Sequence, residues 1–325
     1  MATYAQAKAS VLAKAPVAVT GASGFIGRAL VKRLSARAIP LRLLLRRPDP
    51  ELEALGVEVV RGALDREDSL RRLLDGAATL VHCAGAIRAR RAADFTAVNE
   101  TGTARLVRLA AQSASRPRVL LLSSLAAREP GVSAYAGSKL GGERALVREA
   151  AGLEHFCLRL PAVYGPGDRA TFGLFQQLNR GLGILPAPLN NRFSLLYLSD
   201  LENLVEHLLR QKAWSGGIAE VDDGRAGGYA WSELPEIAAR QLDRRVRAVS
   251  VPQPVLWATA AGSEGVASLL GRAPIWTRGK LNEFSHPDWV SCDGKSSELE
   301  GWEPEVQLDQ GLLATIAWYR QAGWL

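Results

Sequence analysis

The chain is poor in cysteine, with only Cys83, Cys157 and Cys292 in 325 residues. The three are far apart, and none belongs to a Cys-x-x-Cys pair. This spacing indicates neither a disulfide framework nor a structural zinc site. We therefore expect no metal site, and we expect the reducing environment of a cytoplasmic protein.

Long hydrophobic runs are also missing. The longest weakly polar stretch, residues 254–270, contains Ser263 and Glu264 and is interrupted by glycines, so it is too short and too polar to span a bilayer. It predicts a buried or half-buried helix, with an interfacial helix as the alternative. Residues 1–16 are rich in Ala and Lys without a continuous apolar stretch, which predicts an N-terminal tail rather than a signal peptide.

Basic residues outnumber acidic ones, giving a formal net charge of +7. Such a balance could serve nucleic acid, a membrane surface or an anionic substrate. Most basic residues are interleaved with Ala, Leu and Glu, as in Arg66-Glu67-Asp68, which is typical of solvated helix faces. Since no basic cluster is interleaved with aromatic residues, we expect no nucleic-acid partner.

Short apolar runs alternate with amphipathic stretches in the first half of the chain. This pattern predicts an α/β fold with a doubly wound parallel Rossmann sheet. We expect a dinucleotide-binding domain over residues 1–165 and a smaller substrate-binding lobe over 166–325, some of which returns to the sheet. All eight tryptophans lie from Trp214 onward, which suggests that the second lobe has its own packing. Predicted strands cover 16–20, 41–45, 57–60, 79–82, 118–122 and 155–159; predicted helices cover 24–36, 67–74, 93–115 and 133–152.

A glycine-rich loop, Thr20-Gly-Ala-Ser-Gly-Phe-Ile-Gly27, lies between the first predicted strand and helix. Gly21 permits the tight turn, Gly24 lets a pyrophosphate approach the backbone, and Gly27 allows close helix packing. The helix N-terminus offers free N–H groups and the positive end of its dipole. We therefore predict dinucleotide binding, with contacts from Gly21, Ser23, Gly24, Phe25, Ile26 and Gly27.

The end of the second strand distinguishes NAD from NADP. Here the strand ends in Leu45-Arg46-Arg47-Pro48, and the first acidic residue is Asp49. A guanidinium suits a 2′-phosphate because it can form forked hydrogen bonds. The sequence thus favours NADP(H), with Arg46 as the phosphate ligand, and leaves NAD(H) and a pair of solvated arginines open.

Tyr135 and Lys139 are four residues apart at the start of a predicted helix, so they share one face. Ser124 closes the fifth strand, at the edge where open α/β sheets bind ligands. A nearby ammonium and an oxidised nicotinamide would both lower the pKa of the tyrosine from its usual value of about 10. We predict that Tyr135 is the acid/base, with Ser124 holding the substrate oxygen.

Together these motifs resemble the extended short-chain dehydrogenase/reductase family, also called the NAD-dependent epimerase/dehydratase family. The resemblance spans almost the whole chain. It rests on the glycine loop, Val81-His-Cys-Ala-Gly85, Val98-Asn-Glu-Thr-Gly-Thr103, Leu122-Ser-Ser124, Tyr135 with Lys139, Arg159-Leu-Pro-Ala-Val-Tyr-Gly-Pro-Gly167, Leu196-Tyr-Leu-Ser-Asp-Leu201 and the tail from Gly301-Trp-Glu-Pro304 to Trp318-Tyr-Arg320.

The resemblance implies roles for further residues. Ser124, Tyr135 and Lys139 would be catalytic, and Asn99 would lie at a helix irregularity and relay protons through water to Lys139. One departure is Gly62-Ala63-Leu64, where the family often has Gly-Asp-Leu, which removes a carboxylate that would bond the adenine. The serine assignment could also fall on Ser123. The other implied cofactor contacts are Leu64 near the adenine, Ala84 and Gly85 beside the ribose, and Pro161 to Val163 at the nicotinamide amide.

Members of this family include carbonyl reductases, nucleotide-sugar epimerases and non-catalytic cofactor-binding proteins. The leading hypothesis is an NADPH-dependent reductase of a ketone or aldehyde, reversible as an alcohol dehydrogenase. The alternative is a nucleotide-sugar epimerase or reductase, in which Arg192 and Arg169 could bind the diphosphate. A non-catalytic scaffold is the third hypothesis, and the intact Ser124, Tyr135 and Lys139 argue against it. A homodimer is common in the family and stays open here.

Overall fold

The central element is a sheet of seven strands, whose order is β11-β6-β5-β4-β1-β2-β3. Every neighbouring pair is parallel, which confirms the predicted Rossmann sheet. The computed structural model describes residues 15–269, 276–292 and 297–325, so most of the predicted N-terminal tail lies outside them. The strands are β1 Val17–Thr20, β2 Leu41–Leu45, β3 Glu58–Arg61, β4 Thr79–His82, β5 Arg118–Ser124, β6 His155–Leu160 and β11 Ile218–Glu220.

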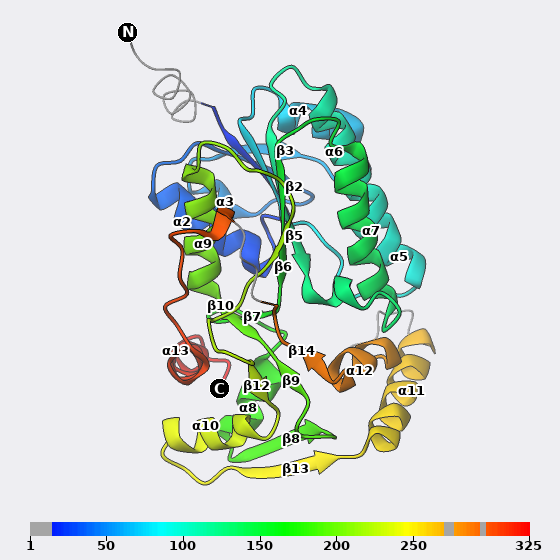
Figure 1. Ribbon diagram of the computed structural model, residues 1–325, viewed down its shortest axis with the longest axis vertical. Coiled ribbons are helices and arrows are strands. Elements are labelled where there is room, and N and C mark those ends of the chain that lie inside the picture. Colours follow the sequence, from blue (N-terminus) through cyan, green and yellow to red (C-terminus); the bar gives the residue numbers. More distant parts are fainter. Residues whose placement is uncertain (1–14, 270–275, 293–296) are drawn as a thin grey trace.

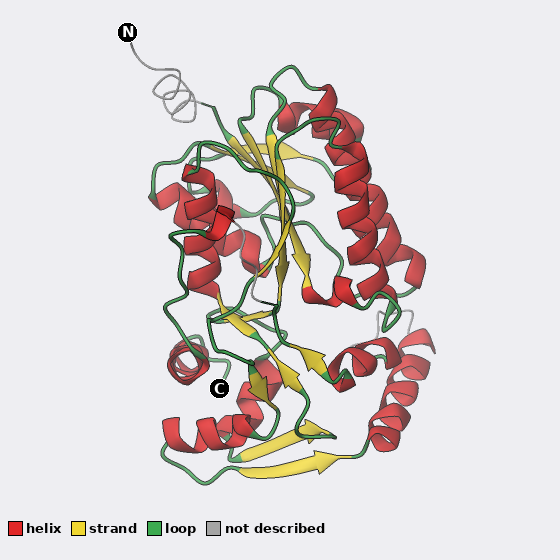
Figure 2. Ribbon diagram, viewed as in Figure 1, coloured by secondary structure: helices red, strands yellow, loops and turns green. Residues whose placement is uncertain are grey.

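Helices cover both faces of this sheet (Figures 1 and 2). Because the strands are almost continuously apolar, each face can bury its own core. One core joins the sheet to α2 and α9, and the other joins it to α4, α6 and α7. The helices of this layer are α2 Phe25–Ala36, α3 Pro50–Glu53, α4 Glu67–Leu74, α5 Ala92–Thr96, α6 Gly102–Gln112, α7 Ala134–Glu149 and α9 Leu198–Arg210, with a 3-10 turn at Leu125–Arg128.

The helix predicted over residues 93–115 is interrupted. A π-helical turn, Ala97–Thr101, separates α5 from α6, and it holds Asn99 at the irregularity that the family resemblance implied. Such turns insert one residue into the helical repeat and often occur at functional sites. The extra residue turns the Asn99 side chain toward the loop that follows β4.

The second lobe has an aromatic core of its own, which includes Tyr164, Phe193, Tyr229, Trp231 and Tyr319. Part of the later chain returns to the first lobe, because β11 pairs with β6 and α9 packs on α2. The lobe contains three small sheets, β7 with β10, β8 with β13, and β9 between β12 and β14. Its elements are β7 Ala162–Tyr164, α8 Phe172–Asn179, β8 Leu182–Pro186, β9 Arg192–Phe193, β10 Leu195–Tyr197, β12 Tyr229–Ala230, α10 Glu233–Gln241, β13 Arg247–Val251, α11 Gln253–Leu269, α12 Arg278–Ser285, β14 Asp288–Trp289, a 3-10 turn Ser297–Leu299 and α13 Leu308–Gln321.

The prediction of a buried or half-buried helix over residues 254–270 is wrong for most of its described part, while the interfacial alternative stays open. In α11 most described side chains are exposed, Trp257 at 44% among them, and only Ala260 and Ala267 are buried. An apolar composition predicts burial only where another element covers the helix. The main packing partner of α11 is α12. None of the described helices combines the length and apolarity needed to cross a membrane.

Candidate active site

The glycine loop joins β1 to α2 and packs against the end of β4. Gly21 has a φ of +71°, and a Cβ there would lie 2.5 Å from the backbone N of Ala84. A Cβ on Gly27 would lie 2.2 Å from the carbonyl oxygen of Gly21. The close packing allowed by Gly27 is thus against the loop itself. Only glycine fits either position without moving the backbone.

The first turn of α2 is suited to an anion. Gly24 is the N-cap residue and supplies no side-chain cap, and the first turn contains no acidic residue. A Cβ at Gly24 would meet only the Gly21 carbonyl, at 3.2 Å. The free N–H groups and the helix dipole can therefore face a phosphate directly, so these residues fit a dinucleotide pyrophosphate.

The acidic residue that follows β2 is held by an arginine of α2. Arg28 donates to both oxygens of Asp49, at 3.1 and 2.5 Å, and holds the pKa of Asp49 below its usual value. Arg46 and Arg47 are exposed directly after β2. No ion pair or hydrogen bond of the Arg46 side chain is seen among the described residues, which leaves its guanidinium available to a ligand.

The end of β4 is tied to the π-helical turn by Asn99. Its side chain accepts a hydrogen bond from the Ala86 N–H at 2.7 Å and donates to the Ala86 carbonyl and the Ser138 hydroxyl. A Cβ on Gly85 would lie 3.3 Å from Asn99 Oδ1 and 4.0 Å from Lys139 Nζ. Asn99 thus positions the loop beside Lys139. Its role in a proton relay stays a prediction.

The remaining predicted cofactor residues lie at the carboxyl ends of β3 and β6. Leu64 follows β3, and its side chain would be 3.0 Å from a Cβ on Gly102 of α6. Pro161 and Val163 follow β6, and Val163 belongs to β7. Both are half-buried. Every one of these segments therefore lies on the edge of the sheet where nucleotides bind in such folds.

Ser124, Tyr135 and Lys139 meet at the end of β5. The Ser124 hydroxyl lies near enough to Tyr135 to influence its pKa, and Lys139 Nζ donates to the Leu122 carbonyl at 2.8 Å. Burial lowers the pKa of Lys139. The Phe95 ring lies edge-on to Tyr135, with centroids 6.0 Å apart. Three elements, β5, α5 and α7, thus hold the tyrosine in place.

The lowering of the Tyr135 pKa by Lys139 and an oxidised nicotinamide stays a prediction, because it depends on a bound cofactor. Burial raises the pKa of Tyr135 to about 12, the negative charge of Glu283 adds to the rise, and the bond to Ser124 opposes it. Burial dominates because removing the phenolate from water disfavours the charged form. In this environment Tyr135 is protonated at neutral pH.

The two serines at the end of β5 have different partners. Ser123 is buried and donates to Glu143 Oε1 at 2.5 Å, whereas Ser124 contacts Tyr135. Its hydroxyl also accepts from the Ala126 N–H, which starts a 3-10 turn. This arrangement favours Ser124 over Ser123 as the group that faces a substrate.

A half-buried ion-pair network behind the site was not anticipated from the sequence. Glu143 pairs with Arg159 at 2.7 Å, Arg159 approaches Glu220 at 3.5 Å, and Glu220 pairs with Arg128 at 3.1 Å. Arg128 also donates to the Val290 carbonyl of the second lobe. The network links α7 to both lobes. A signal was present, since Glu143 follows Lys139 by four residues and shares its helix face.

The arginines considered for a substrate diphosphate have partners within the protein. Arg192 donates to the carbonyls of Gly227 and Gly228 at 2.5 and 3.0 Å, and Arg169 lies over the Trp324 ring at 5.0 Å. Both contacts belong to the internal packing of the second lobe. They do not favour a nucleotide-sugar site built on these two residues.

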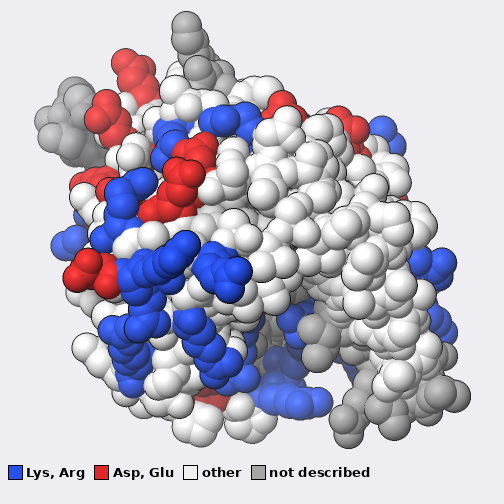
Figure 3. Space-filling model, turned by 90° about the horizontal axis from the view of Figure 1, so that it is seen from below, with Lys and Arg blue, Asp and Glu red and all other residues white. Residues whose placement is uncertain are grey.

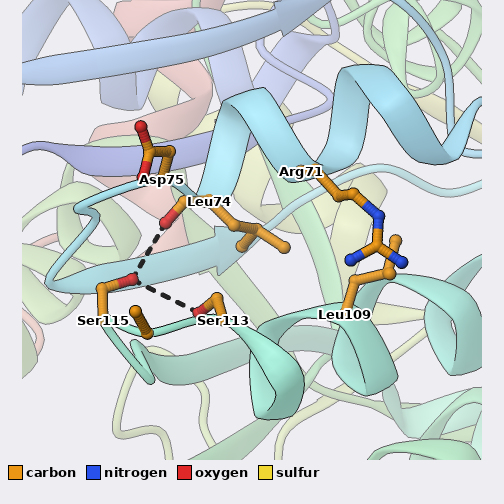
Figure 4. Close-up of a pocket in the computed structure, with 7 residues that line it drawn as sticks. Arg71, Leu74, Asp75, Leu109, Ser113 and Ser115 are labelled. Carbon is orange, nitrogen blue, oxygen red and sulfur yellow. Dashed lines mark hydrogen bonds between the residues drawn. The ribbon is translucent and has the colours of Figure 1, made fainter.

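One pocket lies away from this site (Figure 4). Its lining includes Arg71, Leu74 and Ser115, and the Ser115 hydroxyl donates to the Leu74 carbonyl at 3.0 Å. These residues precede β4 and β5, so the pocket lies at the amino ends of the strands. Its volume is about 170 Å³, below the roughly 300 Å³ at which small-molecule sites begin. It is not a candidate for the cofactor.

Fold and glycine loop together define a nicotinamide-dependent Rossmann enzyme. The model of the NAD dependent epimerase/dehydratase family matches residues 17–220. A ceramide reductase of Caulobacter vibrioides is 37% identical over 315 residues, covering 96% of this chain and 97% of the relative. A UDP-glucose 4-epimerase of Vibrio cholerae is 25% identical over 337 residues, covering 94% and 96%. The chain therefore belongs to the NAD dependent epimerase/dehydratase family of extended short-chain dehydrogenases/reductases.

Solved structures agree on the fold. MoeE5 in complex with UDP-glucose and NAD superposes with a TM-score of 0.71 and 21% identity, covering 94% of this chain and 99% of that chain. At this identity the likeness extends to the fold alone. It nevertheless places both lobes of this chain, and not only the sheet, within the known architecture.

Proposed function

We propose that the protein is an NADPH-dependent reductase that converts a ketone on a long-chain lipid of the ceramide class into an alcohol. The observation that carries the proposal is the convergence of Ser124, Tyr135 and Lys139 at the end of β5, with the half-buried Tyr135 ring packed edge-on against Phe95. A reductase needs a proton donor for the carbonyl oxygen as hydride reaches the carbon.

Ser124, Tyr135 and Lys139 have different roles in the proposed reaction. The hydroxyls of Ser124 and Tyr135 hold the carbonyl oxygen. A reduced nicotinamide supplies the hydride when bound. Tyr135 gives its proton to the oxygen as the C–H bond forms, and the Lys139 ammonium stabilises the tyrosinate that results. Solvent then returns a proton to Tyr135, so the ketone, NADPH and one proton yield the alcohol and NADP⁺.

The choice of NADPH rests on the end of β2. Arg46 is exposed there, while Asp49, the acid that could bond a ribose hydroxyl, is held by Arg28 through both oxygens. An arginine fork matches a 2′-phosphate, and a carboxylate already bound to arginine is a poor acceptor for further hydroxyls. The charge balance at this strand end thus supports NADPH.

The substrate class rests on the relative from Caulobacter vibrioides. That protein is named a ceramide reductase, and the similarity extends over almost all of both chains, including the second lobe where substrate specificity resides in such folds. The apolar character of that lobe is consistent with a lipid. A nucleotide-sugar epimerase is the second candidate, supported by the Vibrio cholerae relative.

One experiment separates the two candidates. The purified protein is denatured, and any released nucleotide is identified by mass spectrometry. A reductase exchanges its cofactor every turnover and should release little, whereas an epimerase retains NAD between half-reactions. The protein is then given NADPH and a detergent-solubilised N-acyl amino-ketone lipid, and both NADPH loss and the alcohol product are followed.

The expected outcome is a nearly empty site and a lipid alcohol formed in step with NADPH oxidation. The Tyr135→Phe protein is the control for background oxidation. Retained NAD together with no NADPH-dependent alcohol would contradict the reductase and favour the epimerase.

A further inference from the structure

Large apolar side chains are exposed at one end of the second lobe. Ile184 of β8 and Val249 of β13 are cross-strand partners on an open two-stranded sheet, and both are exposed. Val255, Trp257 and Val266 are exposed on α11, directly after β13. These five are among the nine exposed large hydrophobic side chains of the described residues. Such a concentration marks an interaction surface rather than scattered surface residues.

The outer side of α11 lacks charge. Among the exposed residues from Gln253 to Val266 there is no Asp, Glu, Lys or Arg. The helix has one charged residue, Glu264, which pairs with Arg278 of α12 at 2.9 Å. A helix at a water-exposed surface ordinarily directs charged side chains outward. The outer side of α11 therefore favours contact with another apolar surface over full exposure to water.

Arginines lie around the start of β13, at the other end of that strand from α11 (Figure 1). Arg240, Arg244, Arg245 and Arg247 are exposed from the end of α10 to the start of β13, and Asp243 is the one acid within that segment. The described part of the chain offers none of the four an ion-pair partner. Figure 3 shows basic side chains gathered on this face, next to a broad area without charge. Glu236 of α10 is the nearest exposed acid before the segment.

We propose that this face docks on an anionic lipid bilayer, with α11 lying in the plane of the interface. Apolar side chains of such a helix enter the boundary between headgroups and acyl chains. Neighbouring arginines are attracted by anionic headgroups, an attraction that falls off within a Debye length. Charge complementarity is what selects a membrane surface over a second copy of this chain, since the same arginines would repel one another across a symmetric contact.

Docking would also bring the active site close to the lipid. α11 packs on α12, whose Glu283 accepts a hydrogen bond from Ser133, two residues before Tyr135. One helix therefore separates the proposed membrane contact from the catalytic tyrosine. This consequence, delivery of a lipid ketone from the bilayer, rests on the proposed function, while the docking surface itself does not.

The test is flotation of the full-length protein with vesicles, in the absence of substrate and cofactor. Vesicles of phosphatidylcholine alone are compared with vesicles containing about one third phosphatidylglycerol, at low and high ionic strength. One variant, V255S/W257S, removes exposed apolar groups, and another, R245E/R247E, reverses charge. Matched controls at exposed sites elsewhere are V147S/L313S and R66E/R72E. Thermal melts establish that each protein is folded.

We expect the protein to float with the anionic vesicles and to be released by salt. Binding should weaken about tenfold or more in V255S/W257S and about thirtyfold or more in R245E/R247E, while both controls bind like the parent. Flotation does not depend on turnover, so it tests membrane docking even if the protein shows no reductase activity. The proposal would be overturned if the parent protein bound neither kind of vesicle, or if V255S/W257S and R245E/R247E bound like the parent. So would light scattering that shows a parent dimer becoming a monomer in V255S/W257S, since a second copy would then cover the face.

Discussion

Arg28 of α2 holds Asp49 through two parallel hydrogen bonds, Nη1 to Oδ1 at 3.1 Å and Nη2 to Oδ2 at 2.5 Å. The same guanidinium reaches Glu51 at 2.6 Å. The first two acids that follow β2 are thereby paired with Arg28, and Arg46 is left exposed without an ion-pair partner among the described residues. This pair leaves Asp49 a poor acceptor for a ribose hydroxyl, which is why Arg46 is the residue to test.

Arg46→Glu should therefore change cofactor preference. Loss of a charge-assisted bond to a phosphate is worth about 1.5–3 kcal/mol, so the Kd for NADPH should rise about tenfold or more. The Kd for NADH should change little. Titration of both cofactors measures the ratio, and Arg72→Glu, at an exposed site of α4, controls for net charge. Equal weakening of both cofactors would remove Arg46 from phosphate recognition.

Tyr135→Phe should stop turnover while leaving cofactor binding nearly unchanged. The substitution removes only the hydroxyl, and the loss of a positioned proton donor lowers kcat by about a hundredfold or more. NADPH binding is measured by titration, and turnover by product formation. A variant that loses cofactor binding instead would contradict the catalytic role.

The pH dependence of reduction follows from the same residue. The protonated form of Tyr135 is the active acid, so its deprotonation lowers the rate only as pH approaches the raised pKa of about 12. We expect no tyrosine-dependent fall in the pH profile of kcat/KM up to about pH 10. A fall in rate centred near neutrality would contradict this expectation and indicate that cofactor or substrate lowers the pKa of Tyr135 strongly.

Ser124→Ala and Ser123→Ala should fail in different ways. Ser124→Ala removes a hydroxyl beside Tyr135 and should lower kcat with little change in stability. Ser123→Ala removes a donor to the buried Glu143, and leaving that carboxylate less satisfied costs about 1–3 kcal/mol of unfolding free energy. Denaturant unfolding and kinetics of both proteins are compared. The reverse pattern would move the substrate contact to Ser123.

Much of this architecture could be predicted because it depends on local pattern. The strands are near-continuous apolar runs, and the turn at Gly21 needs a positive φ. Contacts between distant residues were not predictable in this way. The Arg28–Asp49 pair and the Glu143–Arg159–Glu220 network depend on which elements the fold brings together.

The differences between expectation and structure have physical causes. The pKa of Tyr135 was expected to fall because of Lys139 and an oxidised nicotinamide, and burial, which no spacing reveals, acts in the opposite direction. Exposure of α11 was missed because apolar composition does not say whether another element covers a helix. In both cases the deciding quantity was solvent access to the side chain.

Gly27→Ala tests the cofactor loop directly. The added Cβ would lie 2.2 Å from the Gly21 carbonyl oxygen, so α2 or the loop must shift and the N–H groups that face the pyrophosphate must move. We expect NADPH affinity to fall about tenfold or more. Gly173→Ala in α8 is the matched control, since a Cβ there meets nothing within 4 Å and helix propensity alone would stabilise it by up to about 1 kcal/mol. Unchanged affinity in Gly27→Ala would mean that the loop does not hold the cofactor.

Asp223 should make the second lobe less stable as pH rises. It is buried, it accepts a hydrogen bond from Tyr229 at 2.5 Å, and burial raises its pKa to about 6 from an ordinary value of 3.8. The folded state therefore holds its proton more tightly than the unfolded state. The contribution is fully present below about pH 4 and is lost as pH rises through 6, a change of about 3 kcal/mol at most.

Asp223→Asn isolates this effect, because asparagine stays neutral and its carbonyl can still accept from Tyr229. The unfolding free energy of the parent minus that of the variant should increase as pH is lowered from 7 to 4, since other titrating groups are shared and cancel. Chemical unfolding at several pH values measures the difference. A difference that is constant over this range would show that Asp223 is ionised in the folded protein throughout.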